Sequence, residues 1–158
     1  MSTGTPKQIF IVEDNEIYSM MLDYILSKDS IYKFVNFKSG EECIKNLNLN
    51  PDIIILDYGL PGINGYNTLL EIKKKNPRIH VVILTSHEDE KLKKELLAAG
   101  ADEYILKKDL VAGQVIEKIE TILNTVELES ANDGGVKNKL LYFVLIAVLL
   151  ALGIYYYM

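Results

Sequence analysis

Five short apolar runs alternate along this chain with segments of helical periodicity, and this alternation limits the folds open to it. Three runs are continuous and rich in β-branched residues, as in strands buried on both faces: Ile9–Val12, Ile53–Leu56 and Val81–Leu84. Two weaker runs, Ile31–Phe37 and Tyr104–Leu106, fit edge strands. The alternation predicts an α/β fold. We expect a doubly wound five-stranded parallel sheet in the flavodoxin-like order 2-1-3-4-5.

The intervening segments carry the signals of helices. The first is expected to turn one stripe mainly toward the core, formed by Ile17, Met20, Met21, Tyr24 and Ile25. Ser39 and Glu42 have the spacing of a capping box at the start of a second helix. Gly100 suits the left-handed residue that follows a helix end.

The last 19 residues, 140–158, contain no side chain that is charged near neutral pH. A helix of that length is ~28 Å long, close to the hydrocarbon thickness of a bilayer. Because Lys137 and Lys139 precede the segment and no basic residue follows it, the preceding domain is expected to stay in the cytoplasm. We therefore expect a transmembrane helix at 140–158 in the inner (cytoplasmic) membrane, a linker at 127–139 and a disordered N-terminus at 1–7. A buried core helix is the weaker alternative for the tail, since its apolar residues surround the whole circumference.

Charge and cysteine content narrow the function. The net charge of −5 argues against non-specific nucleic-acid binding, which needs a basic patch. The single cysteine, Cys43, excludes an intrachain disulfide and a cysteine-rich zinc site. No nucleic-acid partner is therefore expected.

The ligand site of such a sheet lies beyond the carboxyl ends of its strands. Glu13 and Asp14 follow the first strand, Asp57 the third, Thr85 the fourth and Lys107 the fifth. Three clustered carboxylates repel one another, and Mg²⁺, which prefers oxygen ligands, relieves that repulsion. A carboxylate can also accept a phosphoryl group, and a lysine can neutralise it. Taken singly, the two aspartates also suit helix caps, and the lysine a solvated position.

Four segments carry a family resemblance: IFIVEDN, IIILDYGLPGINGY, VVILTSHED and GADEYILKK. In this order and spacing they resemble the response-regulator receiver domain, the phosphoacceptor of two-component signalling. The resemblance covers about residues 8–126 and implies a phosphoprotein that receives its phosphoryl group from a histidine kinase or phosphotransfer protein. It also implies a protein that is not an enzyme for a separate substrate, although it catalyses its own phosphorylation and dephosphorylation.

The resemblance assigns the acidic residues to a magnesium site. Asp57 would be the phosphoacceptor and also a metal ligand. Asp14 would bind Mg²⁺ directly, and Glu13 would act mainly through a metal-bound water. Gly59 would offer its backbone carbonyl.

The resemblance also assigns the residues that would respond to phosphorylation. Thr85 and Lys107 would contact the phosphoryl group, and Tyr104 would be the aromatic switch residue, although alone it also suits strand packing. His87 is expected to be an exposed loop residue. Many receivers have a cis-proline after the lysine, whereas this chain has Lys108, so a trans bond is expected there.

The expected function is that of a membrane-anchored receiver whose phosphorylation changes the binding of an unidentified downstream protein. One alternative is a receiver-fold scaffold at the membrane that never uses phosphorylation. A Rossmann-type enzyme is the other alternative. It is disfavoured because residues 13–16 are mostly acidic where a nucleotide site needs glycines.

Overall fold

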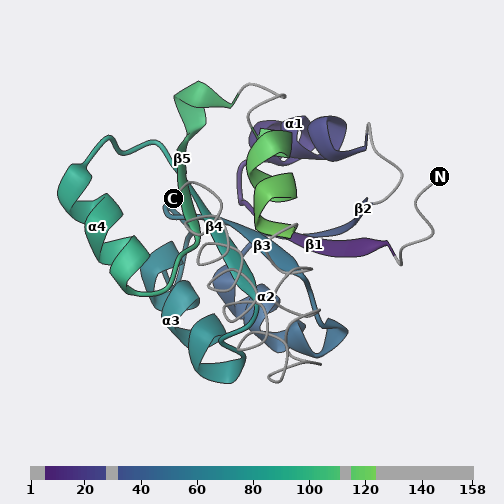
Figure 1. Ribbon diagram of the computed structural model, residues 1–158, viewed down its shortest axis with the longest axis horizontal. Helices are drawn as coiled ribbons and strands as arrows, with labels where there is room; N and C mark the ends of the chain where they lie inside the picture. Colours follow the sequence, from purple (N-terminus) through teal and green to yellow (C-terminus); the bar gives the residue numbers. More distant parts are fainter. Residues whose placement is uncertain (1–5, 28–31, 111–114, 124–158) are drawn as a thin grey trace, which may run out of the picture. The chain divides into compact units, whose positions relative to one another are not determined.

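The computed structural model describes residues 6–27, 32–110 and 115–123 (Figure 1). The compact unit that carries the sheet ends at Glu120. Its strands are β1 (Lys7–Val12), β2 (Tyr32–Phe37), β3 (Ile53–Asp57), β4 (His80–Thr85) and β5 (Glu103–Leu106). Its helices are α1 (Glu16–Leu26), α2 (Gly40–Lys45), α3 (Gly65–Lys75) and α4 (Glu90–Ala98), with 3₁₀ turns η1 (Leu47–Leu49) and η2 (Lys107–Asp109). A further helix spans 115–123.

The five strands form one parallel sheet in the order β2-β1-β3-β4-β5, which confirms the predicted topology. All five residues of β3 are buried because this strand has a neighbour on each side and helices on both faces. The two weaker apolar runs form β2 and β5 at the edges of the sheet, as expected. β1 begins at Lys7.

Alternate strand residues supply the cores on the two faces of the sheet. One core contains Phe10 and Ile54 from the strands, with Leu69 of α3 and Leu96 of α4 packed into the same cluster. Figure 1 shows α2, α3 and α4 on this side of the sheet and α1 on the other. The loops that follow the strands are therefore gathered at one edge, where the polar residues lie.

The predicted core stripe of α1 is wrong for three of its five residues, whereas Ile25 is buried as predicted and Met21 is half-buried. Ile17, Met20 and Tyr24 are 76%, 70% and 66% exposed, whereas Leu22 is fully buried and Ile25 nearly so. The helix EIYSMMLDYIL has apolar side chains on nearly its whole circumference, so the sequence offers two stripes of helical spacing. Packing on β1 and β2 selects the stripe of Leu22 and leaves an apolar surface exposed beside the functional edge.

The two predicted helix-end signals are found in the structure. The Ser39 hydroxyl accepts a hydrogen bond from the backbone N–H of Glu42 at 3.2 Å and so caps α2. The Glu42 carboxylate accepts from the backbone N–H of Lys38, one residue before the partner expected in a capping box. Gly100 follows α4 with a φ of +104°, the left-handed conformation predicted for it.

The predicted linker and transmembrane helix, 127–139 and 140–158, lie outside the described residues. Among the residues that are described, no helix combines the length and apolar character needed to cross a bilayer.

Candidate functional site

Three strand ends bring the ionisable residues of the site together. Glu13 and Asp14 follow β1, and Asp57 is the last residue of β3, which pairs with β1. Lys107 opens η2 directly after β5. The long lysine side chain crosses from that edge strand toward the centre of the sheet, so residues 94 positions apart meet at one point.

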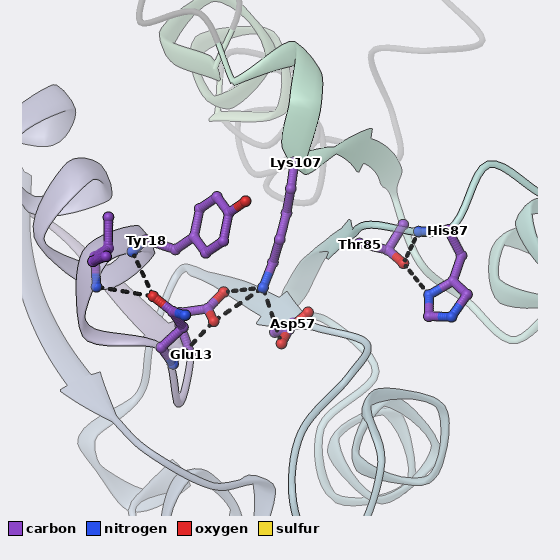
Figure 2. A network of polar contacts seen from close by, with 8 residues as sticks. Glu13, Tyr18, Asp57, Thr85, His87 and Lys107 are labelled. Carbon is purple, nitrogen blue, oxygen red and sulfur yellow. Dashed lines mark hydrogen bonds and ion pairs between the residues drawn. The ribbon is translucent and has the colours of Figure 1, made fainter.

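Lys107 bridges two buried carboxylates. Its Nζ lies 3.1 Å from Asp57 Oδ2, and it lies 2.7 Å and 3.0 Å from the two carboxylate oxygens of Glu13. Figure 2 shows the lysine extending between the two acidic side chains, with the Tyr18 ring alongside. The ammonium nitrogen is 4.5 Å from the centre of that ring, which adds a cation–π contact.

The carboxylates form a cluster with the donor set of a magnesium site. Glu13, Asp14 and Asp57 each place one oxygen within 4.8 Å of the others, and Asp14 is exposed while the other two are buried. Hard oxygen donors with one side open to solvent fit Mg²⁺, which keeps several waters. Gly59 lies beside them, since a Cβ there would be 3.6 Å from Asp57 Oδ2. The residues present therefore fit the ion.

Burial and neighbouring charges shift the pKa values of Glu13 and Lys107 in this cluster. Burial raises the pKa of the Glu13 carboxyl, and the nearby Asp57 charge raises it further, although Lys107 offsets part of the effect. For Lys107, burial acts to lower the pKa, but its contacts with Glu13 and Asp57 outweigh burial and raise the pKa above its usual value. The lysine is therefore firmly charged and supplies a cation where phosphoryl oxygens would arrive.

Thr85 lies at the end of β4, next to β3, and is fully buried. Its hydroxyl oxygen accepts a hydrogen bond from the backbone N–H of His87 at 3.1 Å and is 3.4 Å from the His87 ring Nδ1 (Figure 2). The buried Tyr104 hydroxyl donates to the backbone carbonyl of His87. Thr85 and Tyr104, predicted as switch partners, are thus connected through one residue.

Sequence reasoning missed the contacts of His87 and Tyr18. His87 is exposed as expected, yet it joins Thr85 to Tyr104 and its ring meets the Tyr58 ring edge-on at 5.6 Å between centroids. The only signal for His87 was its place two residues after Thr85. The peptide bond between Lys107 and Lys108 is trans, as predicted.

A doubly wound parallel sheet with an acidic cluster and a lysine at its carboxyl edge defines a class of phosphoryl- or metal-binding α/β domain. Residues 9–120 match the response regulator receiver domain model. The chain belongs to this family and contains a receiver domain, the phosphoacceptor module of two-component signalling.

Individual relatives agree with that assignment. The chain is 27% identical over 117 residues to the transcriptional regulatory protein DegU of Brevibacillus brevis, an alignment covering 73% of this chain and 49% of DegU. The solved response regulator domain of Thermotoga maritima CheB is 30% identical with a TM-score of 0.69, covering 75% of this chain and 96% of that one. A chain of the CheX–CheY–BeF₃–Mg²⁺ complex from Borrelia burgdorferi is 26% identical with a TM-score of 0.70, covering 77% and 92%.

This chain spans about half the length of DegU. The CheB domain, in contrast, is matched over nearly its full length and is a folded chain by itself. A fragment of residues 1–126 contains the whole compact unit that ends at Glu120 and all the residues matched to the family.

Proposed function

We propose that this protein is a membrane-tethered response regulator whose Asp57 accepts a phosphoryl group from a histidine kinase or phosphotransfer protein. In this proposal it acts on no separate substrate, and phosphorylation changes its affinity for a downstream protein. The observation that supports it most directly is the 3.1 Å contact between Lys107 Nζ and Asp57 Oδ2 inside a cluster of three carboxylates.

The proposed chemical step is an in-line displacement. One oxygen of the Asp57 carboxylate forms a bond to phosphorus while the bond from phosphorus to the donor's histidine nitrogen breaks, and the imidazole leaves with its electron pair and takes a proton. Lys107 stabilises the charge on the phosphoryl oxygens and holds the carboxylate in place. Thr85 is the proposed hydrogen-bond donor to a further phosphoryl oxygen.

Glu13, Asp14, Asp57 and the backbone carbonyl of Gly59 are the proposed holders of Mg²⁺. When bound, the ion neutralises negative charge where the donor phosphate approaches. The matched complex from Borrelia burgdorferi, which includes CheY and Mg²⁺, is consistent with this assignment. Lys107 then no longer has to neutralise two carboxylates alone.

The exposed face of α1 is the proposed docking surface for the phosphodonor. Ile17 and Met20 are exposed on the helix that directly follows Asp14, so a partner seated there reaches the acidic cluster. An apolar patch beside polar residues is typical of a protein–protein contact. A donor bound there would position its phosphohistidine over Asp57.

Residues 140–158 are the proposed membrane anchor, with the receiver domain on the cytoplasmic side. The support is the length of this uncharged segment and the position of Lys137 and Lys139 before it. The full chain should stay with the membrane pellet after alkaline carbonate extraction, and a chain ending at residue 126 should not. Release of the full chain by carbonate would contradict the anchor.

Intact-mass spectrometry of the 1–126 fragment tests the phosphoacceptor. Incubation with acetyl phosphate should add one phosphoryl group in the presence of Mg²⁺ and none after chelation. Asp57→Asn is the matched control and should stay unlabelled. Labelling of this variant would show that the phosphoacceptor is a residue other than Asp57. If the wild-type fragment gains no mass while a known receiver is labelled, a phosphorylation-independent scaffold becomes the better reading.

A second assay separates docking from chemistry. Met20→Glu should slow phosphotransfer from a protein donor and leave labelling by acetyl phosphate unchanged, because the small donor does not need α1. Leu97→Glu is the control, since Leu97 is also an exposed apolar residue but lies on α4. Equal transfer rates for both variants would contradict docking on α1.

A further inference from the structure

Within the described domain, basic residues gather at one part of the sheet edge where the strands begin. The carboxyl ends of the strands and the loops that follow them carry six carboxylates, on Glu13, Asp14, Asp57, Glu88, Asp89 and Asp109. The opposite edge, where the strands begin, carries the carboxylates of Asp52, Asp102 and Glu103, and it also receives the ends of α2 and α3 with their basic residues. Lys45 is the last residue of α2, Lys75 is the last of α3, and Arg78 stands just before β4.

A groove of about 650 Å³ opens at this basic edge. Its lining includes Lys45, Lys75, Arg78, Leu47 and Pro77, and no carboxylate is found among the described residues that line it. Lys75 also donates to the backbone carbonyl of Ile44 at 3.1 Å, which ties the end of α3 to the end of α2. The whole chain has a net charge of −5, whereas this groove is lined by three cationic side chains and is locally positive.

The residues around the groove are not all explained by their positions at the ends of helices. Favourable contact with the carboxyl-terminal helix dipole accounts for lysines in the last turns of α2 and α3. It does not account for Arg78, which belongs to neither helix, nor for the 46% exposed Leu49 on the adjacent turn η1. Cations around an exposed apolar side chain form a surface suited to the headgroup region of a lipid layer.

The last described helix contacts the edge where the strands begin. Lys118 makes a 2.8 Å ion pair with Glu103, the first residue of β5, so the helix that starts at residue 115 runs back toward the strand beginnings. From residue 124 to residue 139 the chain offers 16 residues before the apolar tail. Even a partly extended segment of that length spans ~30 Å, enough to let the basic edge meet the bilayer.

We propose that the groove edge formed by Lys45, Lys75 and Arg78 docks on the anionic lipid surface of the membrane that holds the tail. This inference rests on the proposed membrane tether and adds an orientation to it. The basic edge is attracted to anionic headgroups, and the acidic carboxyl edge is repelled from them. Asp57 therefore faces away from the lipid, toward soluble phosphodonors and the cytoplasmic domains of kinases.

Vesicle flotation of the 1–126 fragment tests the docking. Vesicles of phosphatidylcholine mixed with phosphatidylglycerol should bind the fragment, and vesicles of phosphatidylcholine alone should not. The triple variant Lys45→Gln/Lys75→Gln/Arg78→Gln should bind the anionic vesicles ~100-fold more weakly, at about fivefold per cation.

A matched variant removes the same charge from another face. Lys91→Gln/Lys93→Gln/Lys94→Gln on α4 should bind the anionic vesicles within about twofold of wild type, because charges facing away from a surface are screened beyond ~10 Å. Equal loss in both variants would reduce the effect to net charge and overturn the proposal. So would equal binding to both kinds of vesicle, or no binding. Inorganic phosphate provides a further arm: chemical-shift changes confined to the groove, without vesicle binding, would assign it to a free anion.

Failure of this inference is distinguishable from failure of the proposed function. Acetyl phosphate labelling of the same fragments reports on Asp57 and does not depend on the groove. Carbonate extraction of the full chain reports on the anchor. Suppose that the fragment is labelled and the full chain resists extraction, but the fragment does not bind vesicles. This combination would contradict only the docking proposal.

Discussion

Replacing Gly65 by alanine should destabilise the domain although alanine is the better helix former. Gly65 is the first residue of α3 and packs against the end of β3. A Cβ built there would lie 2.5 Å from the backbone carbonyl oxygen of Asp57 and 2.6 Å from the Cα of Tyr58. Both neighbours are backbone atoms, so no side chain can move aside and the helix must shift away from the strand.

The expected cost follows from two opposing effects. Overpacking of a well-packed contact costs about 1–3 kcal/mol in the free energy of unfolding. The higher helix propensity of alanine returns at most about 1 kcal/mol, and less at the first position of a helix. We therefore expect a net loss of about 1–2 kcal/mol, which corresponds to a fall in melting temperature of roughly 5 °C for a domain of this size.

Gly59→Ala is the matched control for this measurement. A Cβ at Gly59 meets only the Asp57 carboxylate oxygens, at 3.6 and 3.8 Å, which is ordinary van der Waals contact. Its free energy of unfolding should stay within about 0.5 kcal/mol of wild type. Urea denaturation of the 1–126 fragment, followed by circular dichroism, compares the two variants. If Gly65→Ala is as stable as Gly59→Ala, the close approach of α3 to β3 is wrong as described.

Three further predictions concern charged residues. Although burial opposes it, contacts led by the 2.7 Å pair with His80 hold the pKa of Asp102 below its usual value. Asp102→Asn should therefore cost about 1.5–3 kcal/mol in urea denaturation at pH 7, and this difference should vanish as the pH falls below about 4, through the folded-state pKa. Without metal, Lys107→Met should lower the free energy of unfolding by about 3 kcal/mol, because two buried carboxylates lose their cation. In a magnesium titration, Mg²⁺ should stabilise this variant more than it stabilises the wild type. Mg²⁺ at ten times its dissociation constant should stabilise the wild-type fragment by about 1.4 kcal/mol, and Asp14→Asn should need a higher concentration in thermal melts for the same gain. An unchanged magnesium titration in Asp14→Asn would contradict its place in the metal site.

The sheet topology could be predicted because the burial of a strand determines which residue types it contains. Ile53–Leu56 is apolar at every position, and only a central strand of a parallel sheet needs that pattern. The positions of Asp57 and Lys107 follow, since strand polarity alone sends both to one edge. Their contact could not be predicted, because the direction of a lysine side chain depends on what surrounds it.

The two failures of sequence reasoning have a common physical origin. On α1, Met20 and Leu22 are both apolar, and only the position of the sheet decides which of them is buried. His87 makes its contacts partly through its own backbone N–H and carbonyl groups, which every residue type offers. Periodicity and residue type carry no information about either choice.

Strand polarity also connects the chemistry of this protein to its proposed place in the cell. In a parallel sheet every strand runs from one edge to the other, and every helix returns. The chain therefore collects Asp57 and its neighbours at the edge where strands end, and its last described helix contacts the edge where strands begin through Lys118. A tether that starts from the last helix thus favours contact between the membrane and the edge opposite the phosphoacceptor. Moving the apolar segment to the N-terminus, before β1, would tether the same edge and preserve phosphotransfer. Inserting it in the loop after β4 would bring the acidic edge to the lipid and slow phosphotransfer from a protein donor.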